Sequence, residues 1–202
     1  GPVIQQAAEV ALMNRTSAQD VMDVVSSVSV PALVMSYWNP IERVGVETFA
    51  ANLAKSGGVG VITPDLTVEE SEPWINATTS HGIDRVYVVA PSSSDERLGK
   101  VTAACSGFVY AASLMGVTGA RNSISHSAAD LVARVRRVTD RPVAVGLGVS
   151  TREQAAQVAH YADGVIVGSA FIKLVLEASN EKDGIERVRV LAAELAAGVR
   201  RS

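Results

Sequence analysis

The stretch Gly107-Phe-Val-Tyr-Ala-Ala-Ser-Leu-Met-Gly-Val-Thr-Gly-Ala120 contains the local patterns that decide the fold. It opens with a short apolar run, the pattern of a strand that is buried on both faces in a parallel sheet. Glycines and hydroxyl residues follow, and these favour a turn that leaves backbone N–H groups accessible. An amphipathic helix is predicted next, at about residues 127–138. The stretch therefore predicts one unit of strand, loop and helix.

The same unit recurs on both sides of this stretch. Further apolar runs lie at residues 31–35, 60–62, 85–90, 142–146 and 164–167. Amphipathic helices are predicted at about residues 46–56, 69–81, 94–105, 151–161 and 184–199. Before the first run, residues 3–28 have a helical pattern that breaks at residues 16–19, where Ser17 is expected to cap a second helix. Six strands that alternate with helices predict an α/β fold with one parallel sheet.

A barrel agrees with this pattern better than an open dinucleotide-binding sheet. The stretch Gly146-Leu-Gly-Val-Ser-Thr151 has only two glycines of the GxGxxG motif and comes late in the chain. A (β/α)₈ barrel uses roughly 31 residues per unit, so 202 residues correspond to about six and a half units. We therefore expect one domain, residues 1–202, with six of the eight strands of a TIM (β/α)₈ barrel.

Composition excludes several classes of function. With 48% apolar and 19% charged residues the chain is globular, and a net charge of −3 gives no basic surface for nucleic acid. The apolar runs are too short for a membrane span. The single cysteine, Cys105, fits a reducing compartment, which predicts a cytoplasmic location, and its context favours a buried thiol over a nucleophile. The three histidines lack zinc-ligand spacing, so we expect no metal site. We also expect no cofactor.

The loops after the last three predicted strands favour phosphate binding. Residues 113–121, 146–150 and 168–170 are rich in glycine and serine, and the last of these loops opens a helix whose positive dipole end attracts anions. Glycine in one such turn is equally explained by backbone geometry, but the three loops together match the phosphate site of this fold. The composition of residues 115–127 is that of a mobile lid.

The earlier strand ends carry apolar and aromatic residues instead. Tyr37 and Trp38 follow the first strand, and Tyr110 ends the fourth. They predict a wall for a flat apolar substrate with a phosphorylated tail, although packing in the barrel core is the alternative for Tyr37 and Trp38. Asp65 is the only carboxylate at a strand end, and we favour a loop-ordering role for it.

The chain resembles the α subunit of tryptophan synthase over its whole length. The matching stretches occur in the family's order: residues 1–5, Tyr37-Trp-Asn-Pro40, residues 63–71, Ala90-Pro-Ser-Ser93, residues 107–120, Gly146-Leu-Gly-Val149 and residues 164–169. The segment with Gly116-Val-Thr-Gly119 is the most specific of them.

This resemblance implies a lyase that converts indole-3-glycerol phosphate to indole and glyceraldehyde 3-phosphate. It also implies a β-subunit partner in an α₂β₂ heterotetramer. By the same resemblance, the phosphate is held by Gly119, Gly148, Gly168 and Ser169, and the substrate pocket is lined by Tyr37, Ile62, Tyr110 and Thr118. Asp65 would order the loop that faces the β subunit, and residues 116–126 would form the lid.

The chain departs from the family at its first residue. Gly1 is the glycine of the family's Gly-Pro-x-Ile-Gln motif, so the catalytic glutamate and aspartate, with the first two strands, would precede it. We therefore expect negligible lyase activity from this chain alone, and apolar strand edges that invite pairing. The chain is expected to be a segment of a complete enzyme, a true fragment, or a variant completed by a partner, in that order.

Two alternatives to the lyase share part of this sequence pattern. Another phosphate barrel, such as a phosphoribosylanthranilate isomerase or an indole-glycerol-phosphate synthase, has the same general pattern, but the synthase needs strand-end lysines that this chain lacks. From a different class, the chain could be a non-catalytic subunit that binds a phosphate ligand and modulates a β subunit.

Overall fold

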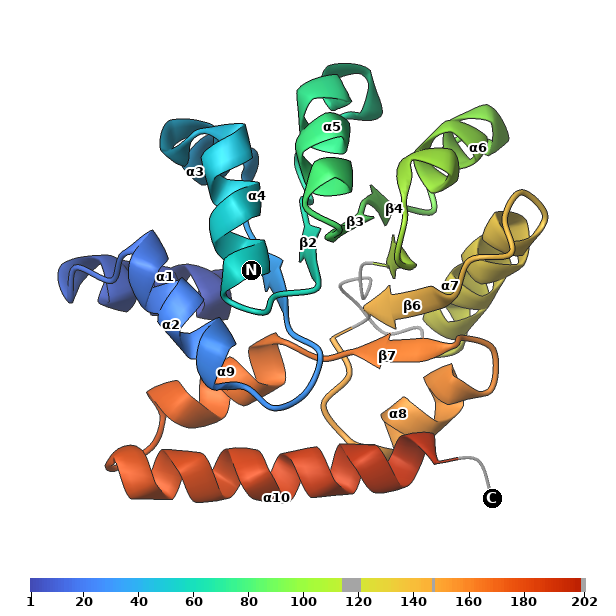
Figure 1. The fold of residues 1–202 in the computed structure, drawn as a ribbon. Coiled ribbons are helices and arrows are strands. Elements are labelled where there is room, and N and C mark those ends of the chain that lie inside the picture. Colours follow the sequence, from blue (N-terminus) through green and yellow to red (C-terminus); the bar gives the residue numbers. More distant parts are fainter. Residues whose placement is uncertain (114–120, 147, 201–202) are drawn as a thin grey trace. The chain divides into compact units, whose positions relative to one another are not determined.

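The computed structural model describes residues 1–113, 121–146 and 148–200, with the backbone only at residues 121–127. Helices and strands alternate along it (Figure 1). The strands are β1 (Leu33–Met35), β2 (Gly60–Ile62), β3 (Asp84–Val86), β4 (Val88–Val89), β5 (Val109–Ala112), β6 (Val143–Gly146) and β7 (Gly164–Ile166). The helices are α1 (Pro2–Met13), α2 (Ala18–Ser27), α3 (Trp38–Val44), α4 (Val46–Lys55), α5 (Glu72–Ser80), α6 (Asp95–Ala104), α7 (Arg121–Arg136), α8 (Arg152–Ala159), α9 (Ser169–Leu176) and α10 (Glu181–Val199), with a 3₁₀ turn η1 (Val68–Glu70).

The chain forms two compact units. The β1 unit comprises Thr16–Tyr110 and Arg134–Pro142, and the β7 unit comprises Gly1–Arg15, Ala111–Ala133 and Val143–Ser202. In the sheets the strand orders are β1-β2-β3 and β4-β5-β6-β7. The parallel pairing of β1 with β2, β2 with β3 and β6 with β7 is that of consecutive βα units.

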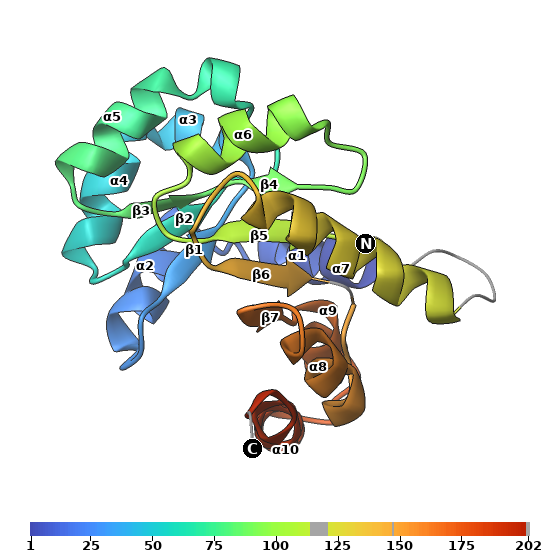
Figure 2. The ribbon, with the colours of Figure 1, turned by 90° about the vertical axis from the view of Figure 1, so that its right-hand side faces the viewer.

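In the β1 unit, helices pack on the β1-β2-β3 sheet, and the large apolar side chains of α4 and α5 are buried. Helices α4 and α5 lie on one face of this sheet (Figure 2). Trp74 of α5 is fully buried, and its ring contacts Trp38 edge-on at 5.8 Å between centroids and Phe49 at 6.2 Å. Aromatic pairs at such spacings add to the stability from burial, so this cluster anchors α3, α4 and α5 together.

Polar caps fix the helix starts, as the sequence predicts for Ser17. The Ser17 hydroxyl accepts a hydrogen bond from the Asp20 amide, and the Asp20 side chain accepts from the Ser17 amide, which completes a capping box. Thr151 and Gln154 form the same arrangement at α8. The starts of these two helices are therefore set by their local sequence.

Several element boundaries differ from the sequence prediction. The run at residues 85–90 forms two strands, β3 and β4, because the Tyr87 amide between them donates to the Sγ of Cys105 instead of continuing the ladder. Helix α3 was not predicted. The helix expected at residues 69–81 begins as the 3₁₀ turn η1, and the helix expected from residue 127 begins at Arg121.

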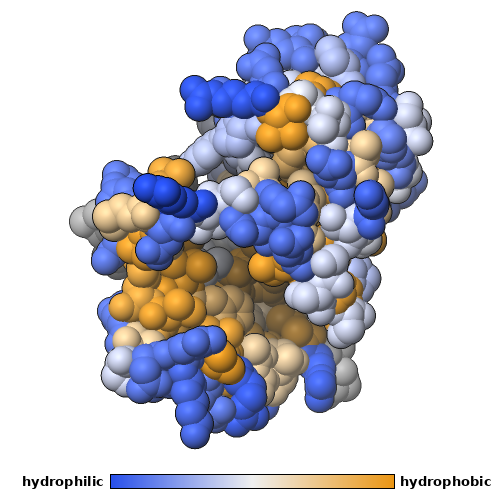
Figure 3. Space-filling view, turned by 60° about the vertical axis from the view of Figure 1, so that its left-hand side comes forward, coloured by the Kyte–Doolittle hydropathy of each residue, from blue (hydrophilic) through white to orange (hydrophobic). Residues whose placement is uncertain are grey.

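In the β7 unit, the long helix α10 runs along α8 and α9 (Figure 1). The approach to α8 is close at Gly198, where an added Cβ would lie 2.4 Å from the carbonyl oxygen of Arg152. Neither α1 nor α9 has a buried residue, and Leu12 and Met13 of α1 are 73% and 75% exposed. Figure 3 brings forward the side where α1 lies in Figure 1, and apolar side chains gather there.

Candidate functional site

The carboxyl ends of β1, β2 and β3 lie level with one another. The parallel register pairs Met35 with Ile62 and Ile62 with Val86, the last residues of the three strands. Ile62, a predicted pocket residue, is partly exposed at this edge. Tyr37 lies two residues after the end of β1 and is 68% exposed. It therefore does not pack in the core, and the alternative interpretation of Tyr37 as a core residue is wrong.

Asp65 joins the loop after β2 to the start of α3. Its Oδ1 and Oδ2 accept hydrogen bonds from the Trp38 amide at 2.9 and 3.1 Å. Trp38 is the first residue of α3, so the carboxylate lies at the positive end of the helix dipole, where a negative charge is stabilising. A loop-ordering role for Asp65 requires a contact of this kind.

Tyr110 belongs to the same unit but to strand β5. It is half-buried, and its amide donates to the Tyr87 carbonyl at 3.2 Å. Burial raises the pKa of the Tyr110 phenol above its ordinary value of 10.0, so the ring carries a neutral hydroxyl at neutral pH. The strand register brings Ile62 level with the end of β1, whereas Tyr110 comes from the other sheet.

The predicted phosphate-binding residues that the structure describes belong to the β7 unit. Gly148 is exposed and has φ +69°, a left-handed conformation that favours glycine. Gly168 caps α9, and Ser169 is the first helical residue, where backbone N–H groups have no intrahelical partner. Thr118 and Gly119 lie outside the described residues, as does the first part of the predicted lid, residues 116–120.

Gly168 leaves open space at the start of α9. An added Cβ would meet no atom within 4 Å, and the φ of −130° is one that any residue adopts. Neither backbone strain nor packing against the described residues therefore requires glycine here. Access for an anion to the first N–H groups of α9 is a remaining physical reason.

Two further contacts at strand-end loops have no signal in the local sequence. Arg97 of α6 pairs with Glu69 of η1, and Arg134 of α7 pairs with Asp95 at the start of α6. The partners are 28 and 39 residues apart. Sequence reasoning missed both pairs because only the fold brings them together.

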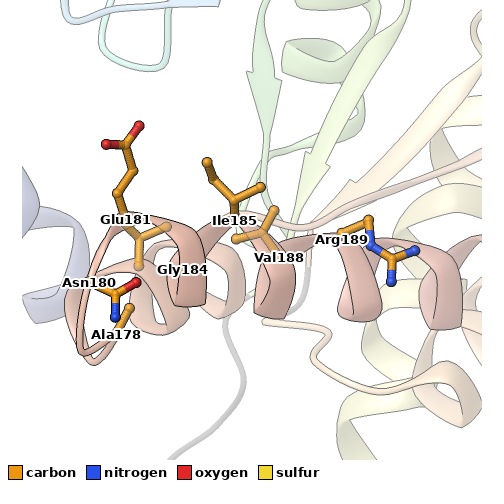
Figure 4. Close-up of a pocket in the computed structure, with 8 residues that line it drawn as sticks. Ala178, Asn180, Glu181, Gly184, Ile185, Val188 and Arg189 are labelled. Atoms are coloured by element: carbon orange, nitrogen blue, oxygen red, sulfur yellow. The ribbon is translucent and has the colours of Figure 1, made fainter.

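Among the described residues, an apolar pocket also lies between α9 and α10. Its volume is about 490 Å³, and in Figure 4 Ile185 and Val188 project from the same side of α10. Its lining comprises Val175, Ala178, Asn180, Glu181, Gly184, Ile185, Val188 and Arg189. It contains none of the predicted site residues, so it gives no support to their assignment.

Neither a metal-ligand cluster of three or more His, Cys, Asp or Glu residues nor a helix able to cross a membrane occurs in the described ranges.

Known proteins similar to this chain agree on one family. The model of the family described as "Tryptophan synthase alpha chain" matches residues 1–200. The tryptophan synthase alpha chain of Streptomyces avermitilis is 58% identical over 204 residues, which cover 99% of this chain and 74% of the relative. Tryptophan synthase from M. tuberculosis, in an aminoacrylate- and BRD0059-bound form, superposes with a TM-score of 0.90 at 47% identity and covers 100% of this chain and 76% of its own. A tryptophan synthase complex from Pyrococcus furiosus gives a TM-score of 0.85 at 33% identity, with 97% and 80% covered.

Proposed function

Because the chain belongs to the tryptophan synthase alpha chain family, we propose that it acts in the lyase reaction that forms indole and glyceraldehyde 3-phosphate from indole-3-glycerol phosphate. The observation that carries this proposal is the family match across residues 1–200. The same match supports a β-subunit partner in a heterotetramer. The single cysteine suits a reducing compartment, so we place the chain in the cytoplasm.

The proposed site divides the substrate into an apolar ring and an anionic tail. Tyr37, Ile62, Tyr110 and Thr118 would contact the indole ring. Gly119, Gly148, Gly168 and Ser169 would hold the phosphate. Open space at Gly168 and the free first-turn N–H groups of α9 support the second assignment.

The reaction breaks the bond between indole C3 and the neighbouring carbinol carbon. The electron pair stays on the ring, C3 takes a proton, and the carbinol oxygen loses one as the aldehyde forms. Asp65, a carboxylate in the loop after β2, accepts hydrogen bonds from the Trp38 amide. We therefore assign binding and orientation of the substrate to the residues above, and loop ordering to Asp65.

Substitution of Gly168 by alanine tests the phosphate assignment. A Cβ at this position meets nothing within 4 Å, so G168A leaves the fold unchanged but occupies space where the phosphate would lie. We expect G168A to weaken binding of indole-3-propanol phosphate, an unreactive indole alkyl phosphate, by about tenfold in calorimetric titration. The matched control is G99A in α6, where a Cβ also meets nothing. Equal affinities of G168A and wild type would remove Gly168 from the site.

A second candidate is a non-catalytic subunit that binds the phosphate ligand and modulates a β subunit. The engagement of Asp65 by a backbone amide favours this candidate, because that carboxylate is committed to holding a loop. Indole release from indole-3-glycerol phosphate, measured with and without a tryptophan synthase β subunit, separates the two. Indole formation supports the lyase. A changed β-subunit rate without indole formation supports the modulator.

A further inference from the structure

The loop after β4 is a closed turn at a strand end. It contains the stretch Ala90-Pro-Ser-Ser93, to which the proposed site assigns no role. The Ser93 amide donates to the Ala90 carbonyl at 2.9 Å, and the Ser93 hydroxyl accepts from the Ala90 amide at 3.2 Å. Ser94 then caps α6 by accepting from the Arg97 amide. In barrels of this kind, ligands bind among the loops that follow the strands, so this turn belongs to the functional face.

Arg134 donates hydrogen bonds to this turn and to the following Asp95 through all three nitrogens of its guanidinium group. Its Nε donates to Asp95 Oδ1 at 2.8 Å, its Nη1 donates to the Pro91 carbonyl at 3.1 Å, and its Nη2 donates to the Ser93 carbonyl. The Arg134 side chain is 25% exposed, against 66% for Asp95. A planar guanidinium offers several donors in a fixed fork, which a lysine ammonium does not. The contacts therefore fix both the position and the conformation of the turn.

Two other strand-end loops of the β1 unit are also held by a charged residue from later in the chain. Asp65 holds the start of α3, and Arg97 holds η1 through Glu69. Arg134 differs from Arg97 because it binds two backbone carbonyls of the loop directly. Loss of Arg134 would therefore free the backbone of the loop, whereas loss of Arg97 would free only a side chain.

We propose that Arg134 is a positioning residue for the substrate site, acting through the turn at residues 90–94. This inference rests on the proposed function. The turn follows β4, the sheet neighbour of β5, which carries Tyr110. The proposed phosphate-binding residues follow β5, β6 and β7 instead. The turn therefore borders the indole part of the substrate, and Arg134 governs affinity for the ring and not for the phosphate.

The experiment compares R134M and R134K with the wild-type chain. Dissociation constants are measured for indole-3-propanol phosphate and for inorganic phosphate, together with the unfolding midpoint and hydrogen exchange of residues 90–95. The control is R137M, which removes a neighbouring charge that lies 3.9 Å from Asp95 and is 66% exposed. R134K retains a charge for Asp95 but loses the fork, so it separates an ion pair from the carbonyl contacts.

We expect R134M and R134K to bind indole-3-propanol phosphate at least about fivefold more weakly, with unchanged affinity for inorganic phosphate and faster exchange at residues 90–95. R137M should match the wild type. The inference is overturned if R134M binds the indole phosphate as tightly as wild type, if R134K restores full affinity, or if both ligands weaken together with a lowered unfolding midpoint. Failure of the wild-type chain to bind indole-3-propanol phosphate would instead contradict the proposed function.

Discussion

At the scale of single residues, the carboxylate of Asp65 has the most specific contact in the candidate site. The carboxylate accepts a hydrogen bond from the amide of Trp38, the first residue of α3, which is 27 residues away in the sequence. This is the contact that a helix-capping side chain makes. We expect D65A to lower the free energy of unfolding by about 1 kcal/mol, which is the usual cost of losing a cap. Urea unfolding measures this change. D140A is the control, because Asp140 is exposed and has no described contact; an equal effect of the two substitutions would show that the contact contributes nothing.

Cys105 provides a second prediction at this scale. Cys105 is 1% exposed, which confirms the prediction of a buried thiol. Burial raises the pKa of the thiol above its ordinary value of 9.0. Above pH 9 the unfolded chain releases this proton while the folded chain keeps it, so stability that is present below pH 9 is lost as the pH rises. We expect C105A to lose less stability than wild type between pH 8.5 and about 10. Equal losses would contradict this prediction.

At the scale of elements, two helical glycines predict opposite effects of the same substitution. In α6, a Cβ at Gly99 meets nothing, so G99A should stabilise the chain by about 0.5–1 kcal/mol through helix propensity. In α10, a Cβ at Gly198 would lie 2.4 Å from the Arg152 carbonyl, so G198A should destabilise it by about 1–3 kcal/mol. Thermal unfolding of the two variants measures both effects. A stabilising G198A would contradict the close packing of α10 on α8.

The capping box of α2 predicts a dependence of stability on acid pH. Hydrogen bonds from the Ser17 backbone and hydroxyl lower the pKa of Asp20 below its ordinary value of 3.8. The stabilisation is therefore complete above about pH 4 and is lost as the pH falls through the lowered pKa. We expect D20N to be less stable than wild type at pH 6 and to lose less stability on acidification to pH 3. If D20N and wild type lose the same amount of stability between pH 6 and pH 3, the prediction is wrong.

How far the sequence predicts these elements depends on how local their causes are. Apolar runs locate the strands, and Ser17 and Thr151 locate helix starts, because each signal lies within a few residues of its effect. Helix α3 was not predicted, because the local sequence Trp38-Asn-Pro40 is typical of a loop. The hydrogen bond from the Trp38 amide to Asp65, which lies far along the chain, is not visible in that local sequence. The split between β3 and β4 likewise depends on Cys105, 18 residues after Tyr87.

The candidate site has the same limit. Glycine-rich loops and aromatic residues at strand ends can be recognised from residue types alone. The sequence therefore predicts Gly148, Gly168 and Tyr37 as site residues. The open space at Gly168 and the fork of Arg134 depend on which backbone atoms lie nearby, and residue types alone do not predict that. The roles of these residues in binding remain predictions, of which G168A tests the one for Gly168 and the Arg134 variants test the one for Arg134.

At the scale of the whole molecule, the two compact units share continuous elements. Strand β5 and helix α7 each run from one unit into the other, and the chain passes between the units four times. Such interleaving favours a single domain, in which neither unit is a contiguous piece of chain able to unfold by itself.

We therefore expect one cooperative unfolding transition. Trp38 and Trp74 both report on the β1 unit, and F171W in a W38F/W74F background would place the only tryptophan in α9 of the β7 unit. Urea unfolding followed by fluorescence should then coincide with unfolding followed by far-UV circular dichroism in each of the two chains, because one transition changes every probe together. Fluorescence and dichroism midpoints that separate within either chain would show instead that the two units are independent domains.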